Sequence, residues 1–99
     1  MKPTTTIQRV MSISHAEFLR SLEPLRKHYP YQIDGSQRQI LLQDKDQHIE
    51  IRLGDERRKQ LGALELPVTT VEFRFDAGKQ QDIECFLSRF DLCFRRGGG

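Results

Sequence analysis

The sequence predicts an α+β fold, in which an antiparallel sheet of about five strands carries two helices on one face. Residues 48–53 and 71–75 alternate apolar and polar side chains, which is typical of strands with one buried face. Residues 80–95 predict a terminal helix with one apolar stripe, formed by Ile83, Phe86, Leu87, Phe90 and Phe94. The predicted order is β-α-β-β-β-(β)-β-α in a single domain covering residues 1–99, with residues 97–99 as a flexible C-terminal tail.

The chain begins with a predicted strand over residues 4–13. Consecutive threonines favour extended backbone at its start, and Ile7, Met11 and Ile13 fall on one face. Arg9 falls on the same face. Because a cation is costly inside a sheet core, we expect this strand to lie near a sheet edge.

A helix with a break is predicted next. Ser14 and Glu17 form a capping box, in which the Ser14 side chain accepts a hydrogen bond from the Glu17 N–H. The apolar residues that follow lie on one helical stripe: Phe18, Leu22, Leu25 and Tyr29. Pro24 removes a backbone donor within this segment, so we expect a kink or a break into two pieces.

Three strands are predicted as a meander over residues 31–34, 38–42 and 48–53. Asp34-Gly35-Ser36 has the composition of a tight turn between the first two. Residues 54–60 form the most charged stretch of the chain and contain no apolar anchor. They therefore predict an exposed loop.

Residues 61–68 are ambiguous. Leu64, Leu66 and Val68 alternate as in a strand, but after Pro67 the apolar phase shifts by one residue. A bulge between residues 67 and 70 would explain the shift, and Pro67 itself favours an edge strand or a strand start.

Composition limits the possible classes of protein. Lys and Arg total 16 and Asp and Glu total 14, and a net charge of +2 does not by itself indicate nucleic-acid or membrane binding. No apolar run approaches a membrane span, and residues 1–10 lack the apolar core of a secretory signal. Cys85 and Cys93 are about 12 Å apart along one predicted helix, which is beyond disulfide reach. We therefore expect a cytoplasmic protein with reduced thiols.

No pattern indicates a catalytic or cofactor site. His15, His28 and His48 are isolated from one another and from the cysteines at metal-site spacing. The sequence contains no Walker loop, no Gly-x-Gly-x-x-Gly and no Gly-x-Ser-x-Gly. We therefore expect no metal and no cofactor. An enzyme with a Cys85 nucleophile beside Arg89 is left as a third alternative.

The preferred interpretation is a small cytoplasmic interaction module without catalytic activity. Its expected contact surfaces are the free face of the sheet and the outer side of the last helix. A helical wheel places an apolar pair with flanking cations on that outer side, namely Cys85, Arg89, Leu92 and Arg96. The expected partner is another protein or, through a weak contact, a second copy of the chain.

Nucleic-acid binding is the main alternative. The sequence places basic residues on two predicted strands and in the charged loop between them, where they could gather at one end of the sheet: Arg52, Arg57, Arg58, Lys59 and Arg74. Phe73 and Phe75 alternate with Glu72 and Arg74, so we expect the phenyl rings to face the helices rather than stack on bases.

The C-terminal residues Arg95-Arg96-Gly97-Gly98-Gly99 resemble the ends of ubiquitin-like carriers. That resemblance implies a glycine carboxylate that an adenylating enzyme activates. It covers these five residues only. In the carriers the tail follows a strand, whereas here it follows a predicted helix.

Overall fold

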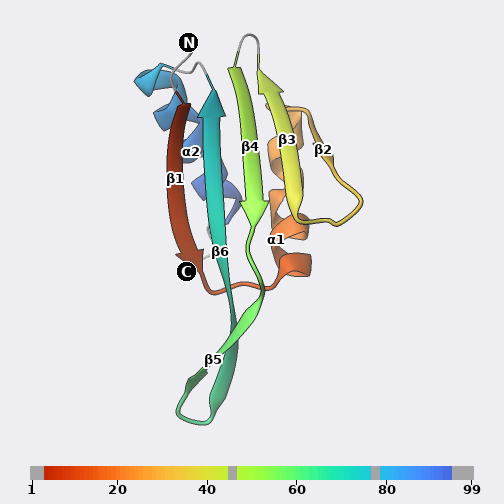
Figure 1. The fold of residues 1–99 in the computed structure, drawn as a ribbon, viewed down its shortest axis with the longest axis vertical. Coiled ribbons are helices and arrows are strands. Elements are labelled where there is room, and N and C mark those ends of the chain that lie inside the picture. Colours follow the sequence, from red (N-terminus) through yellow and green to blue (C-terminus); the bar gives the residue numbers. More distant parts are fainter. Residues whose placement is uncertain (1–3, 45–46, 77–78, 95–99) are drawn as a thin grey trace.

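A computed structural model describes residues 4–44, 47–76 and 79–94. These residues form an antiparallel sheet with two α-helices, and both the class and the element order agree with the sequence prediction (Figure 1). The elements are β1 (Thr4–Met11), α1 (His15–Leu22), the 3₁₀ helix η1 (Glu23–Lys27), β2 (Tyr31–Ile33), β3 (Gln39–Asp44), β4 (Gln47–Leu53), β5 (Arg57–Leu61), β6 (Leu64–Asp76) and α2 (Gln80–Cys93).

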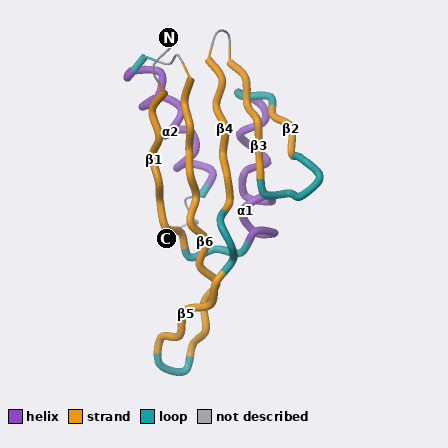
Figure 2. Tube along the Cα trace, in the orientation of Figure 1, coloured by secondary structure: helices purple, strands orange, loops and turns teal. Residues whose placement is uncertain are grey.

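The sheet has the strand order β1-β6-β4-β3-β2, and every neighbouring pair is antiparallel. Both helices lie behind this sheet on the same face, so the opposite face has no helix over it (Figure 2). β5 stands apart from the five-strand path and pairs with the first part of β6. As predicted, β1 lies at an edge of the sheet: it is the first strand in the order and pairs on one side only, with β6.

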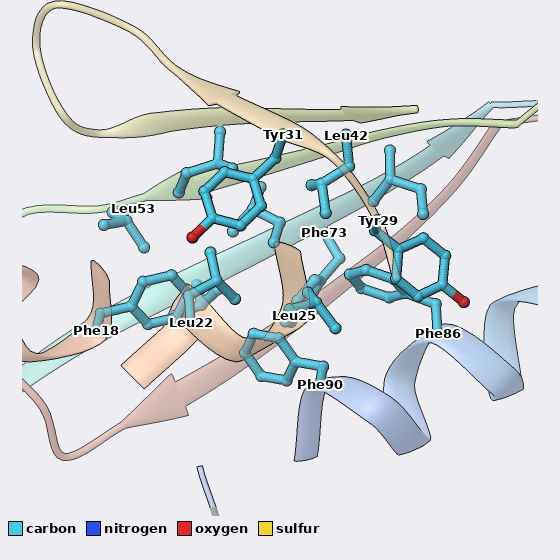
Figure 3. Packing of buried hydrophobic residues seen from close by; sticks show 14 of the residues in the cluster. Phe18, Leu22, Leu25, Tyr29, Tyr31, Leu42, Leu53, Phe73, Phe86 and Phe90 are labelled. Atoms are coloured by element: carbon cyan, nitrogen blue, oxygen red, sulfur yellow. The ribbon is translucent and has the colours of Figure 1, made fainter. Parts of the chain in front are cut away.

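The core lies between the sheet and the helices and is rich in phenylalanine (Figure 3). Phe73 from β6 meets Phe90 of α2 edge to face, with ring centroids 4.9 Å apart. Phe18 from α1 lies 5.9 Å from the same Phe90 ring. All three side chains are fully buried. Burial of each such ring stabilises the fold by about 1.5–3 kcal/mol.

The first helix begins and ends as the sequence predicts, with a serine cap and a break near Pro24. The Ser14 hydroxyl accepts a hydrogen bond from the Glu17 N–H at 3.2 Å and caps α1. The α-helix ends at Leu22, and the chain continues through Pro24 as the tighter 3₁₀ helix η1. A proline near the start of η1 is tolerated because its missing N–H is not needed there.

The predicted exposed loop over residues 54–60 is wrong, since Arg57–Leu61 forms β5. This strand pairs with Leu64–Val68 across a two-residue turn at Gly62-Ala63. Gly62 has a φ of +60°, which fits the first central position of a type II′ hairpin turn. The strand is stabilised by its partner rather than by apolar anchors of its own, because all five of its residues are exposed.

The predicted bulge in β6 is also wrong. Leu53 pairs with Val71, and Arg57 pairs with Val68. Between these two pairs the chain advances by three residues in β6 (68 to 71) and by four residues in the partner segment (53 to 57). The extra residue therefore lies between β4 and β5, and β6 runs unbroken. Consequently, the even-numbered side chains Leu64, Leu66 and Val68 lie on the opposite face from Val71, on the side that no helix covers.

Replacing Thr69 by valine is expected to lower the free energy of unfolding by about 1–3 kcal/mol. The Thr69 hydroxyl is fully buried and donates to the carbonyl oxygen of Ile13 at 2.8 Å. Valine keeps the shape of the side chain but leaves that oxygen without this donor. Urea unfolding measures the change, with Thr70→Val as the control at a partly exposed position. Equal losses in the two variants would contradict the prediction.

Candidate binding surface

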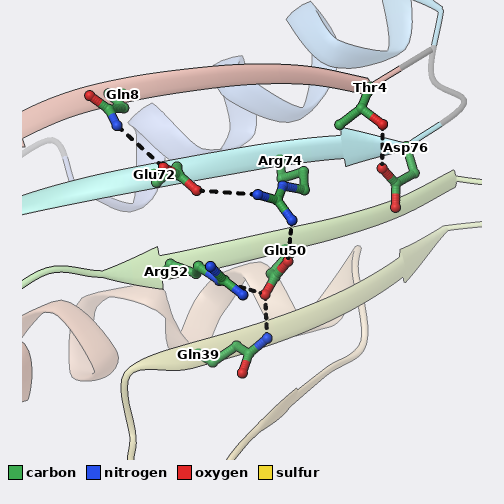
Figure 4. A network of polar contacts seen from close by, with 8 residues as sticks. All are labelled: Thr4, Gln8, Gln39, Glu50, Arg52, Glu72, Arg74 and Asp76. Carbon is green, nitrogen blue, oxygen red and sulfur yellow. Dashed lines mark hydrogen bonds and ion pairs between the residues drawn. The ribbon is translucent and has the colours of Figure 1, made fainter.

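The uncovered face of the sheet carries a network of paired charges (Figure 4). Glu50 lies at its centre, 2.9 Å from the Arg52 Nε and 3.8 Å from an Arg74 nitrogen. Arg74 also lies 3.9 Å from Glu72, which accepts a hydrogen bond from Gln8. Each cation of this network has a carboxylate neighbour, so this part of the face offers little net positive charge.

The basic residues of the nucleic-acid alternative therefore fall into two groups. Arg52 and Arg74 lie in the charge network on the sheet. Arg57, Arg58 and Lys59 are consecutive residues of β5 and lie beyond the end of the meander. The structure brings the last three together but does not place them with the first two.

β5, its turn and Leu64–Val68 of β6 form a two-stranded ribbon, which we call the arm. The arm projects from one end of the sheet (Figure 1) and contributes to the elongated shape, whose extents are 48 × 29 × 25 Å. Two-stranded ribbons are marginally stable in isolation, so the arm depends on its connection to the rest of β6.

An apolar stripe runs along one face of the arm. Cross-strand pairing places Leu61 beside Leu64 and Lys59 beside Leu66. Leu61 is 50% exposed and Leu64 is 65% exposed. Arg57 pairs with Val68 at the foot of the arm on the same face. We call Leu61, Leu64, Leu66 and Val68 the arm stripe; Val68 is buried at the foot, and the other three residues form an apolar surface with two cations beside the stripe.

The foot of the arm is fixed to the domain by polar contacts. The His15 ring Nε2 lies 2.7 Å from the Gly54 carbonyl oxygen, and the His15 backbone N–H donates to Glu56 at 2.8 Å. Arg38 donates to Asp55 and forms an ion pair with it. These contacts hold the three residues between β4 and β5, where the strand pairing changes register.

Replacing Arg38 by alanine is expected to raise the pKa of the Asp55 carboxyl. The hydrogen bond from Arg38 and then its positive charge hold this pKa below the ordinary value of 3.8. A lowered pKa in the folded state stabilises the fold above the ordinary value, and this contribution is lost as the pH falls through the lowered pKa. A carboxyl NMR titration measures the shift. Arg20→Ala is the control, and a pKa of Asp55 unchanged in Arg38→Ala would contradict the assignment.

The predicted patch on the last helix is brought together only in part. Cys85 is exposed and Leu92 is 59% exposed, as the helical wheel predicts. Arg89 donates to the His28 ring Nε2 at 3.2 Å, so that nitrogen accepts. Arg89 and Leu92 line a shallow hollow of about 240 Å³ between η1 and α2, and Cys85 is not among its lining residues.

Two predictions on this helix lie partly outside the described residues. Arg96, and the Gly97-Gly98-Gly99 tail on which the carrier resemblance depends, are outside them.

Cys93 lines the same hollow as Leu92, and burial raises the pKa of its thiol. A raised pKa makes a thiol a weaker nucleophile at neutral pH.

The described residues show no cluster of metal-ligating side chains. Across residues 4–44, 47–76 and 79–94, no three His, Cys, Asp or Glu side chains cluster in a way that could hold a metal ion. His15 lies at the foot of the arm and His28 beside α2, so these side chains act in separate places. In the same ranges, no helix has the length and apolar character needed to cross a bilayer.

Sequence reasoning missed the arm stripe, although a signal for it is present. Gly62-Ala63 is a glycine-containing two-residue turn that precedes the alternating residues Leu64, Leu66 and Val68, and such a turn is a signal for a hairpin. The charge of residues 54–60 obscured this signal because it suggested a loop.

No family model, curated protein or solved structure matches the chain.

Proposed function

We propose that this chain is a small binding module for another protein, which it contacts with the uncovered sheet face and the arm. One observation carries the proposal: Leu61 and Leu64 of the arm stripe are at least half exposed, and the arm projects away from the core. Apolar surface of this kind, bordered by polar residues, is typical of protein-interaction sites.

The arrangement of the arm supports binding rather than a role in stability. The core is complete between the sheet and the helices, where Phe73, Phe86 and Phe90 are fully buried. Every residue of β5 is exposed. The two cysteines are free, which supports the further proposal of a reducing, cytoplasmic location.

Site-specific photo-crosslinking in the native cells tests this function. A photoreactive phenylalanine analogue at position 64 is expected to give discrete adducts with another protein, and these adducts are expected to disappear when Leu61 and Leu66 are both serine. The matched control carries the same group at Gln81, which is exposed on α2. Adducts that are equal at both positions, or absent at position 64, would contradict the proposal.

A second candidate function is nucleic-acid binding through the arm. Arg57, Arg58 and Lys59 form a continuous basic run on a two-stranded ribbon, and such ribbons fit the major groove of a duplex. Replacing all three by alanine is expected to reduce duplex affinity and flatten its dependence on salt. Fluorescence anisotropy at several salt concentrations measures both, and absence of binding at low salt would exclude this candidate.

A further inference from the structure

We propose that the partner contributes an acidic extended segment, which pairs with the outer edge of β5 as an additional strand. This inference rests on the proposed function and specifies the chemistry of the partner. It follows from three features of the arm: the direction of its backbone groups, the position of Pro67 and the charge of β5.

The backbone of β5 has an open side. In a two-residue hairpin the closing pair exchanges backbone hydrogen bonds, so Leu61 and Leu64 face each other with their N–H and C=O groups. The direction alternates along a strand. Lys59 therefore also faces β6, whereas the N–H and C=O groups of Arg58 and Gln60 point away from it, toward the outer edge.

The contact of Ser12 with Pro67 supports this assignment independently. Arg58 pairs with Pro67, and the Pro67 carbonyl oxygen accepts a hydrogen bond from the Ser12 hydroxyl at 3.3 Å. Ser12 directly follows β1, so the Pro67 backbone faces the β1 side and not β5. Arg58, opposite Pro67, therefore also points its backbone groups outward.

Pro67 makes the two edges of the arm unequal. Proline has no backbone N–H, so the β6 edge lacks a donor where a strand continuing β1 would need one. β5 contains no proline and presents both donors and acceptors along its outer edge. The space for an added strand lies past the N-terminal end of β3. The residue before β3, Arg38, already pairs with the end of β4, because its carbonyl oxygen accepts a hydrogen bond from the Leu53 N–H at 2.8 Å.

The charge of β5 selects the kind of strand. Arg57, Arg58 and Lys59 are consecutive, so they present cations on both faces of the edge. Pairing of β5 with a second copy of itself would place like charges opposite each other, which is unfavourable. An acidic strand would instead place carboxylates opposite these cations. Arg58 also lies 3.9 Å from Glu65, but both side chains are exposed, so this ion pair is weak and leaves Arg58 able to pair with a carboxylate of the added strand.

Lysine and arginine on an edge strand also serve to keep copies of a protein apart. That role alone predicts repulsion between copies and no binding of an acidic strand. The following experiment distinguishes the two roles because it measures backbone hydrogen bonds directly.

The experiment measures amide hydrogen exchange by NMR in the full-length ¹⁵N-labelled protein. The probe is an eight-residue peptide of alternating valine and glutamate, and its control has lysine in place of glutamate. The glutamate peptide is expected to slow exchange at Arg58 and Gln60 at least tenfold, with Lys59 little changed. Unchanged exchange at Arg58 and Gln60 at millimolar peptide would overturn the proposal, and the cations would then serve only to keep copies apart.

Two variants sharpen the test. Gln60→Pro removes an outward N–H without removing a ladder bond to β6, and it is expected to abolish peptide binding while Gln60→Ala retains it. Reversing the charges in Arg57→Glu/Lys59→Glu is expected to transfer binding from the glutamate peptide to the lysine peptide. If Gln60→Pro disrupts the arm, the exchange pattern of the wild-type protein and the charge reversal still decide the question.

The outcomes separate this inference from the function on which it rests. Crosslinks at position 64 without slowed exchange at Arg58 and Gln60 would leave a protein-binding module that does not add a strand. Loss of both results would remove the module as well. Duplex binding without amide protection would favour the nucleic-acid candidate instead.

Discussion

Replacing Phe86 by alanine is expected to lower the free energy of unfolding by about 3–5 kcal/mol. Phe86 projects from α2 into the core and is fully buried. Its ring meets those of Tyr29 and Phe75 edge to face, with centroids 5.2 and 5.6 Å away. Alanine leaves a cavity between the helix layer and the sheet. A domain of this size has a total stability of about 5–15 kcal/mol, so the substitution is expected to remove a large fraction of it.

Chemical denaturation followed by circular dichroism measures this loss. Leu92→Ala on the same helix is the control, because its side chain is 59% exposed. That control is expected to change the stability by less than about 0.5 kcal/mol. A comparable loss in the two variants would mean that the apolar face of α2 is assigned incorrectly.

Shortening the arm is expected to abolish partner binding and leave the domain folded. Residues 58–67 would be replaced by Asn-Gly, so that the new two-residue turn closes on the Arg57–Val68 pair. This pair faces inward like the native closing pair, and Asn-Gly suits a two-residue hairpin turn. The unfolding free energy is expected to change by less than about 1 kcal/mol, because the removed segment includes the two most exposed leucines of the arm stripe.

Crosslinking from position 10 reports on binding in the shortened protein, since Val10 is 69% exposed on the uncovered face and pairs with Thr70 near the foot of the arm. Adducts in the full-length chain and none in the shortened chain are the expected result. The glutamate peptide serves as a second readout. Retained binding with a shortened arm would move the contact surface to the sheet alone.

Local chemistry accounts for the elements that were predicted correctly. Ile49, Ile51 and Leu53 alternate with polar residues and are all buried, so β4 could be identified from its own sequence. The end of α1 followed from Pro24, which acts on the turn that contains it. Such features depend on a few neighbouring residues and do not require knowledge of the rest of the fold.

β5 could not be identified in the same way. Its residues are exposed on both faces, so they carry no apolar alternation, and the strand depends on pairing with β6 across Gly62. The phase shift near Pro67 was recognised, but its position in space depends on the strand register. The sequence of β6 alone does not reveal that the extra residue belongs to its partner.

The candidate surface shows the same division. Exposure of Leu92 and Cys85 follows from helical periodicity within α2. The contact of Arg89 with His28 joins residues 61 positions apart and depends on how η1 packs against α2. Likewise, the ion pair of Arg74 with Glu50 joins β6 to β4 and is identified only once the strands are aligned.

Pro67 has a consequence for polymerisation. Fibre growth by stacked strands requires each subunit to offer a competent edge on both sides, so that every added strand becomes the template for the next. At the arm, the β6 side lacks a donor at Pro67, and growth in that direction therefore stops. An arm of this construction accommodates one extended segment on its β5 side and does not propagate into a fibre.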